Sequence, residues 1–238
     1  MYSHILIKKN AWAFRQSNNE AILAALLTTV LSGVSSSVQY RFNNYQSPDF
    51  SFGLYLFVLV FSLALSIFVC YPVTVGSAGW FSQAVRGNKQ PVSSIFNCFS
   101  QTYKSTVILG VIKSIYIFAW SLLFLIPGII KSYAYSMAEY IKSDNPDLSY
   151  DQVLELSNRI TKGHKGDLFY LDLSFTGWYI VGTLTCLIGN ILLVSPYYLS
   201  AKAFAYEMLK SEAISSGTAS AQEFGGYGQS PFTDYKSF

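Results

Sequence analysis

Ionisable side chains inside apolar sequence are the residues of this chain whose type and position could do chemistry. Lys113, Lys131, Glu139, Asp172 and Lys202 all lie within or beside long apolar runs. A charge at the centre of a bilayer costs about 2.5–3.5 kcal/mol on insertion scales, so such residues usually pair with one another or line a polar cavity. We therefore expect Asp172 to point into the interior and to pair with a lysine, with Lys113 as the first candidate. For each residue the alternative is a place at the membrane interface, where a long side chain reaches the headgroups.

Hydroxyl groups accompany these charges in one segment. Ser132, Ser136 and Tyr140 recur at every fourth position and so share one face of a helix. Tyr133 and Glu139 flank that face. A face this polar cannot contact lipid acyl chains. We expect it to lie inside a helix bundle or to line a water-filled cavity.

A basic cluster stands shortly before the apolar run that contains Asp172. It consists of Arg159, Lys162, His164 and Lys165, which fall within about two helical turns. Such clusters bind anionic lipid headgroups, and each basic residue near the membrane surface contributes about 1 kcal/mol. The alternative is that the cluster only sets the orientation of the chain, because basic residues are enriched in cytoplasmic loops.

The sequence contains few residues that would indicate a catalytic or metal-binding site. His164 could form an acid–base pair with Asp167 or Asp172, but no nucleophile accompanies them. The two histidines and three cysteines are too widely spaced for a metal site or a disulfide framework. We therefore expect no catalytic residue, no metal and no cofactor. The net charge of +3 is too small to indicate a nucleic-acid partner.

The composition indicates that the elements carrying these residues lie in a membrane. Hydrophobic residues make up 51% of the chain and charged residues only 12%. Soluble domains carry about 25% charged residues, so this chain has too few charges to cover a water-facing surface. Aromatic residues reach 17%, and tyrosine in particular suits the boundary between headgroups and acyl chains.

Six apolar runs could cross a bilayer, which requires about 20 mostly apolar residues per helix. They are Glu20–Tyr40, Leu54–Tyr71, Thr106–Ile126, Ile129–Ile141, Leu168–Val194 and Pro196–Leu209. The second run reaches Pro72 and could continue past it as a kinked helix. The first run follows several basic residues and could be a secretory signal, but further runs follow it, so we expect a retained helix.

The positions of lysine and arginine predict the orientation. When the two shorter runs are counted as spans, both termini, residues 85–105 and residues 142–167 all face the cytoplasm. They hold almost all flanking basic residues, among them Arg86, Lys142 and Lys210. We therefore expect an all-α polytopic transmembrane bundle of about six spans over residues 20–210, following a cytoplasmic segment 1–19. Residues 211–238 are rich in Ser, Gly and Ala without periodicity, which predicts a disordered tail.

Two amphipathic segments are expected at the cytoplasmic surface. Pro91–Tyr103 places apolar residues at helical spacing opposite serine and asparagine, which suits a helix lying in the interface. The second segment begins at Ser149, which with Gln152 reads as a capping box, and ends near Thr161.

Four segments carry a resemblance to a known family. They are IPGIIKSYAYSM (126–137), DNP (144–146), KGHKGDLFYLDLSFTGW (162–178) and PYY (196–198). Together they resemble a family of bacterial multi-pass membrane proteins, found mainly in Gram-positive organisms and catalogued as a domain of unknown function. The resemblance extends from about Lys8 to Lys210 and implies a helical bundle in the plasma membrane without an established chemistry.

Three functions remain open on these grounds. We expect a non-catalytic plasma-membrane protein that binds or moves an amphiphile or small solute, or that serves as an accessory subunit. A membrane-embedded enzyme acting on lipid headgroups would instead bring His164, Asp172 and a nucleophile into one cytoplasmic pocket. A purely structural partner of another membrane complex is the third alternative. The expected partners are the lipid bilayer and anionic lipid headgroups, and a membrane protein is a further candidate partner.

Overall fold

The computed structural model describes residues 4–43, 52–100, 102–184 and 190–226, and every regular element in these ranges is helical. The predicted all-α class is therefore confirmed for the described residues. In chain order the elements are α1 (His4–Ser17), α2 (Asn19–Asn43), α3 (Phe52–Leu65), the π-helical η1 (Ser66–Cys70), α4 (Tyr71–Val85), the 3-10 helix η2 (Val92–Phe99), α5 (Tyr103–Leu123), α6 (Leu125–Ala134), α7 (Ala138–Asp144), α8 (Tyr150–Ile160), α9 (Lys165–Leu184), the π-helical η3 (Asn190–Val194), α10 (Ser195–Ser215) and the 3-10 helix η4 (Ala221–Phe224).

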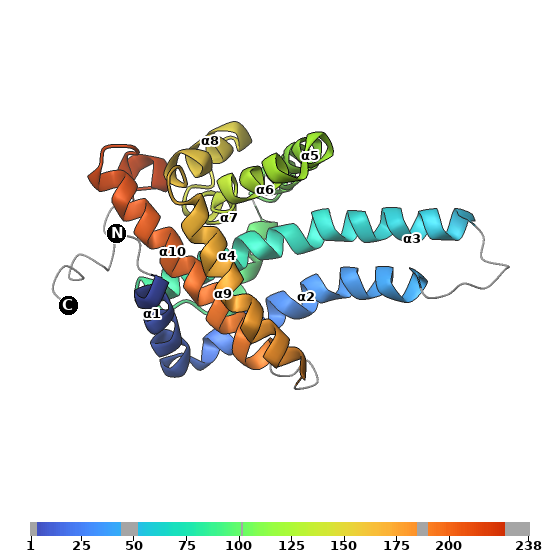
Figure 1. Ribbon diagram of the computed structural model, residues 1–238, viewed down its shortest axis with the longest axis horizontal. Coiled ribbons are helices and arrows are strands. Elements are labelled where there is room, and N and C mark those ends of the chain that lie inside the picture. The colour runs from blue at the N-terminus through green and yellow to red at the C-terminus, as the bar shows by residue number, and fades with distance from the viewer. Residues whose placement is uncertain (1–3, 44–51, 101, 185–189, 227–238) are drawn as a thin grey trace.

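Helix α10 lies at the centre of the fold, in contact with α1, α2, α4 and α8 (Figure 1). Ala201, Ala203, Ala205 and Tyr206 of this helix are all fully buried. Successive residues point about 100° apart around a helix, so burial at these neighbouring positions requires other elements on all sides. The small alanine side chains permit that close approach. Polar residues of α10 can therefore find partners on several helices.

Helices α3, η1 and α4 run without interruption from Phe52 to Val85. Pro72 stands in the first turn of α4, and the π-helical turn η1 directly precedes it. Proline lacks the N–H that would bond one turn back, and a wider local turn accommodates its ring. The predicted continuation of the second apolar run beyond Pro72 is confirmed.

Within the described residues, two helical stretches are long and apolar enough to cross a membrane. They are Leu56–Val85, with mean hydropathy 2.5, and Tyr103–Leu123, with mean hydropathy 1.9. Phe57, Phe118 and Leu122 in these stretches are 65%, 68% and 78% exposed. Helices α2 and α3 lie side by side and project beyond the other helices (Figure 1). Helices α3 and α5 thus present large apolar surfaces that the described part of the chain does not cover.

The six-span bundle is not confirmed, and the predicted span Ile129–Ile141 is not one continuous helix. Helix α6 ends at Ala134 and α7 begins at Ala138. The hydroxyl of Ser157 on α8 donates to the Ala134 carbonyl at 2.8 Å and accepts from the Met137 amide at 3.3 Å. The Ser157 hydroxyl thereby bonds one backbone group on each side of the break. In a continuous helix these two groups would form hydrogen bonds within the helix. The 10 residues of α6 extend about 15 Å, half of a hydrocarbon core of about 30 Å.

Both predicted amphipathic segments are helical. Helix α8 begins with the expected capping box, in which the side chains of Ser149 and Gln152 each accept from the backbone N–H of the other residue. Its apolar side chains pack against the rest of the fold. In the 91–103 segment, residues Val92–Phe99 form the 3-10 helix η2 instead of an α-helix. Ile95 of η2 is fully buried, and its carbonyl oxygen lies only 1.9 Å from where a Cβ on Gly76 would stand. Glycine is therefore required where η2 meets α4.

The C-terminal segment is ordered further than its composition predicts. Helix α10 continues to Ser215, and Phe224 of η4 is fully buried. The Phe224 ring lies 6.5 Å from the Tyr206 ring, and the Lys210 ammonium lies 5.3 Å from the centre of Phe224. The Asn145 amide donates to the carbonyls of residues 222 and 223. The predicted disorder from residue 211 therefore does not hold for residues 211–226, whereas residues 227–238 lie outside the described residues.

Candidate functional site

The carboxylate of Asp172 on α9 is bonded to two residues of α10. It lies 2.8 Å from the Lys202 ammonium and accepts a hydrogen bond of 3.2 Å from the Tyr198 hydroxyl. Tyr198 and Lys202 are four residues apart, so they lie on the same face of α10. The expected pairing of Asp172 with a lysine is confirmed, but Lys113 is the wrong partner.

The ring of Tyr133 on α6 completes this group. The Lys202 ammonium lies 6.0 Å from the centre of the Tyr133 ring and 5.6 Å from that of Tyr198. A cation over an aromatic face is attracted by the negative potential of the ring. We refer to Tyr133, Asp172, Tyr198 and Lys202 as the central cluster. Its charges cancel, and its residues join α6, α9 and α10.

Lys113 pairs with Glu139 instead. Its ammonium on α5 lies 2.6 Å from the Glu139 carboxylate, and the two side chains are only 14% and 12% exposed. Glu139 occupies the first turn of α7, where the positive end of the helix dipole favours a carboxylate. Glu139 therefore lies next to α5 and pairs with Lys113, whereas Asp172 pairs with Lys202 in a separate ion pair.

The remaining residues of the predicted polar face are dispersed. Ser132 and Ser136 each donate to the backbone carbonyl three residues earlier, at 2.7 and 2.8 Å. Tyr140 is buried and stacks on Tyr206, with ring centres 5.1 Å apart. Lys131 lies over an aromatic ring of α5, 5.2 Å from its centre. Because the break between α6 and α7 separates Ser132 from Tyr140, the predicted common face does not form.

A second cluster of charge is enclosed where the ends of α4 and α7 meet α10. The Arg86 guanidinium lies 2.5 Å from the Asp144 carboxylate and 2.6 Å from that of Glu207. The Lys210 ammonium lies 2.9 Å from the same Asp144 oxygen, to which the Tyr206 hydroxyl donates at 2.9 Å. No charged side chain in this group is more than 6% exposed. We refer to these five residues as the buried charge network.

The network balances its charges internally. Burial alone would lower the pKa of Arg86, but hydrogen bonds to Glu207 and Asp144 outweigh burial and raise it. Burial lowers the pKa of Lys210, and the two carboxylates offset this only in part. The sequence did not predict the network, because Arg86 and Lys210 stand at the ends of apolar runs and were interpreted as orientation signals. The available signal was Asp144, which belongs to the DNP segment.

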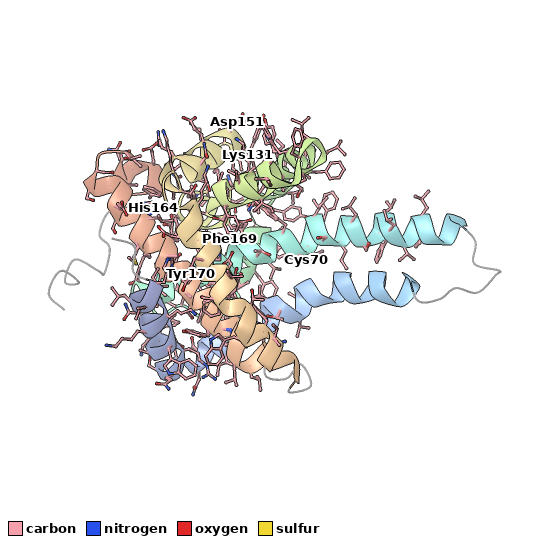
Figure 2. The ribbon with its side chains drawn as sticks, in the orientation of Figure 1. Cys70, Lys131, Asp151, His164, Phe169 and Tyr170 are labelled. Atoms are coloured by element: carbon pink, nitrogen blue, oxygen red, sulfur yellow. The ribbon has the colours of Figure 1, made fainter. Side chains whose placement is uncertain are left out.

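The predicted headgroup residues gather beside α10. Arg159, Lys162 and His164 line a pocket of about 150 Å³ together with Glu212 and its neighbours on the last turn of α10. We refer to it as the basic pocket, and Figure 2 shows His164 beside α10. Lys165 lies next to these residues, with its ammonium bonded at 3.1 Å to an asparagine side chain of α8. Three of the four predicted residues therefore share one pocket.

Positive charge accumulates around this pocket. Burial lowers the pKa of Lys165, and the nearby ammonium groups of Lys131 and Lys162 lower it further. Figure 2 shows Lys131 of α6 in the same region as Asp151 of α8, consistent with the packing of α6 against α8. Lys131 thus contributes to the potential of the basic cluster, although the sequence placed it inside a separate span.

Carboxylates of the chain itself neutralise part of this charge. The Arg159 guanidinium donates to Glu223 of η4, and the His164 ring nitrogens each lie 3.2 Å from a carboxylate oxygen, one of them on Glu212. Burial would raise the pKa of Glu223, but hydrogen bonds from the Ser220 backbone N–H and from Arg159 outweigh burial and lower the pKa. Lys162 is exposed at the rim.

The structure brings His164 to Asp167, one of its two candidate acid–base partners, at 3.2 Å, but not to Asp172. His164 lies in the basic pocket, whereas Asp172 is engaged by Lys202 and Tyr198 in the central cluster. The two residues that the enzymatic alternative required in one place are therefore separated. Among the residues that the structure describes, no group of three or more His, Cys, Asp or Glu side chains could hold a metal ion.

In the part of the chain that the structure describes, the fold is all-helical, with two apolar helices of membrane-spanning length and ion pairs enclosed between helices. The chain belongs to a family described as "Protein of unknown function (DUF975)", whose family model matches residues 11–213. No curated protein and no solved structure matches the chain. The family match therefore assigns no activity, and function has to be argued from the sites.

Proposed function

We propose that this chain is a non-catalytic, multi-pass protein of a bacterial plasma membrane that binds the anionic headgroup of a lipid in its basic pocket. The observation that carries the proposal is the convergence of Arg159, Lys162 and His164 on one cavity of about 150 Å³, which is large enough for a phosphate group. Arginine and lysine are the side chains that recognise phosphate oxygens in proteins. Exposed Lys162 leaves this charge accessible from the surface.

The exposed apolar helices support the membrane placement. Soluble proteins rarely expose contiguous apolar surface on the scale of α3 and α5. The stretch Leu56–Val85 has 30 residues, so it extends about 45 Å and passes beyond a hydrocarbon core of about 30 Å. Arg86 follows directly, at the level of the headgroups. The distribution of basic residues supports a cytoplasmic location for both termini and the basic pocket, where anionic lipids are available.

The four segments that carry the family resemblance support a fixed scaffold. Each supplies one residue to the central cluster or the buried charge network: Tyr133, Asp144, Asp172 and Tyr198. These residues hold helices together and satisfy one another's charges. Binding at a preformed surface pocket is therefore favoured over transport through the interior. We also assign the chain to the bacterial, mainly Gram-positive, membrane proteins that these segments resemble.

Competition between lipids tests the proposal. The protein is incorporated into phosphatidylcholine nanodiscs, and its preference for phosphatidylglycerol over phosphatidylcholine is measured by native mass spectrometry. Lys162→Gln and Lys165→Gln should each reduce this preference by about fivefold, the equivalent of about 1 kcal/mol per basic residue. The double variant should reduce the preference more than either single variant does. Added salt should also weaken the preference, because salt screens the exposed edge of the basic cluster.

Lys104→Gln is the matched control. Lys104 is an exposed lysine on the first turn of α5, outside the basic pocket, and its replacement removes the same charge. It should leave the preference unchanged. An undiminished preference in the double variant would refute the proposal and leave the basic cluster as an orientation signal only.

A further inference from the structure

A separate polar pocket lies between α4, η2, α5 and α7. Its volume is about 210 Å³. Neutral amide and hydroxyl side chains from all four elements line it: Gln83, Gln90, Ser94, Asn97, Thr106 and Ser143. The indole of Trp80 forms part of the same wall. The proposed headgroup site is formed by α8 and α10, so the two pockets share no lining residue.

Close backbone packing builds the walls of this pocket. A Cβ on Gly76 would lie 1.9 Å from the Ile95 carbonyl oxygen, and one on Gly79 would lie 1.8 Å from the Ser143 hydroxyl. Both η2 and α7 therefore touch the backbone of α4 on either side of the cavity. The Trp80 indole N–H donates to the Gln90 carbonyl at 3.0 Å and fixes the loop that leads into η2. The pocket is thus held by defined contacts on three sides.

The lining selects an uncharged ligand that both donates and accepts hydrogen bonds. Amides and hydroxyls offer donors and acceptors together, as the hydroxyls of a polyol do. Among the described residues that line the pocket there is no carboxylate, and the Lys142 ammonium already donates to the carbonyls of Pro146 and Leu148 at 2.7 Å each. A cationic ligand would therefore lose hydration without meeting a counter-charge, and an anionic ligand would meet only an ammonium that already donates two hydrogen bonds to backbone carbonyls.

The surroundings place this pocket at the level of lipid headgroups. Trp80 and Gln83 lie in the last two turns of α4, at the end of the apolar stretch proposed to cross the membrane. Phe96 and Phe99 of η2 are 44% and 38% exposed, and Phe99 stacks on Tyr103 at 5.7 Å. Helices that lie in the membrane interface bury Phe side chains at the boundary of headgroups and acyl chains, and Trp and Tyr are enriched at the same level.

We propose that this pocket binds the uncharged polyhydroxyl headgroup of a lipid, a sugar or glycerol group, with the acyl chains alongside Phe96 and Phe99. The inference takes the membrane placement from the proposed function, but it does not depend on the binding of anionic lipid. The same hydroxyl chemistry is present in free sugars. The exposed aromatic residues beside the pocket favour the lipid as the source.

Binding of a glycosyl diacylglycerol tests the inference. The whole chain is purified in a detergent without sugar groups, and native mass spectrometry compares glucosyl diacylglycerol, the corresponding diacylglycerol and free methyl glucoside. The wild type should retain the glucosyl lipid in preference to the other two. Thr106→Val, which replaces a hydroxyl by a methyl of similar size, should reduce this preference about three- to tenfold, and so should Asn97→Leu.

Ser93→Ala is the matched control, because Ser93 is exposed on η2 and does not line the pocket. It should bind as the wild type does, and thermal unfolding of each variant verifies folding. If Asn97→Leu does not fold, Thr106→Val against Ser93→Ala decides the result. Equal retention of glucosyl lipid and diacylglycerol, or an unchanged preference in Thr106→Val, would overturn the inference. Equal affinity for methyl glucoside would overturn the assignment to a lipid. The phosphatidylglycerol preference of the same variants reports the proposed function separately.

Discussion

Replacing Arg86 by methionine should destabilise the protein far more than the loss of a surface charge. Arg86 donates to Glu207 through Nε at 2.9 Å and through Nη2 at 2.6 Å, and to Asp144 at 2.5 Å. Its removal leaves two carboxylates, each 1% exposed, facing the single ammonium of Lys210. Removing one member of a buried ion pair costs about 3–5 kcal/mol. For a chain of this length each 1 kcal/mol shifts Tm by about 2–4 °C, so Tm should fall by about 6–20 °C.

The double variant Arg86→Met/Glu207→Gln should unfold at a higher temperature than Arg86→Met alone. It leaves one carboxylate, Asp144, paired with one ammonium, Lys210, so the enclosed charges balance again. Lowering the pH should also restore part of the stability of Arg86→Met, because protonation removes the uncompensated negative charge. Thermal unfolding followed by circular dichroism of the detergent-purified protein measures both effects.

Lys89→Met provides the comparison, because Lys89 is exposed on the loop that follows Arg86. Its stability should change by no more than about 0.5 kcal/mol. The reasoning fails if Arg86→Met unfolds at the same temperature as Lys89→Met. It also fails if the losses at Arg86 and Glu207 simply add, since residues of one charge network should show a coupling of about 0.5–3 kcal/mol.

Three further predictions follow from the clusters. Asp172→Asn and Lys202→Met should be non-additive in Tm, whereas Asp172→Asn and Lys113→Met should add, and the reverse result would contradict the observed pairs. The pKa of Glu223 lies below its ordinary value of 4.5, so its contribution to docking of the C-terminal segment is present above pH 4.5 and is lost as the pH falls through the lower folded-state value. Hydrogen exchange of that segment, corrected for the intrinsic rate, should rise in this window, and Glu223→Gln should show no such rise. A cysteine at position 162 in a background without the native cysteines should resist an impermeant reagent in intact cells and react after lysis, and strong labelling in intact cells would reject the orientation.

Local signals in the sequence predicted the elements that depend on neighbours in the chain. The all-helical class follows from long apolar runs and low charge, and the start of α8 follows from Ser149 and Gln152, whose capping contacts span three residues. The helix beyond Pro72 was also indicated by composition, since apolar sequence continues on both sides of it. These features need no knowledge of the tertiary structure.

Contacts between distant residues decided the rest. The break between α6 and α7 depends on Ser157, which lies 23 residues beyond the carbonyl of Ala134 that it binds. The order of residues 219–226 depends on Phe224, which lies against Tyr206 and Lys210 on α10. The partner of Asp172 depends on which lysine lies within bonding distance once α9 and α10 have come together, and that lysine is Lys202. Composition and periodicity do not indicate which distant residues come into contact.

Some basic residues act both as orientation signals and as interior partners. Arg86, Lys142 and Lys210 were counted among the cytoplasmic charges, yet the first and third belong to the buried charge network and the second bonds backbone carbonyls. In the proposed membrane placement the two roles are compatible, because a basic residue at the end of a helix can set the orientation and still bond to a neighbouring helix on the same side. The ends of α4 and α7 and residue 210 of α10 can meet only if they lie on the same side of the membrane. The contacts of Asp144 with Arg86 and Lys210 therefore agree with one common side for these three helix ends, and only the distribution of basic residues predicts which side that is.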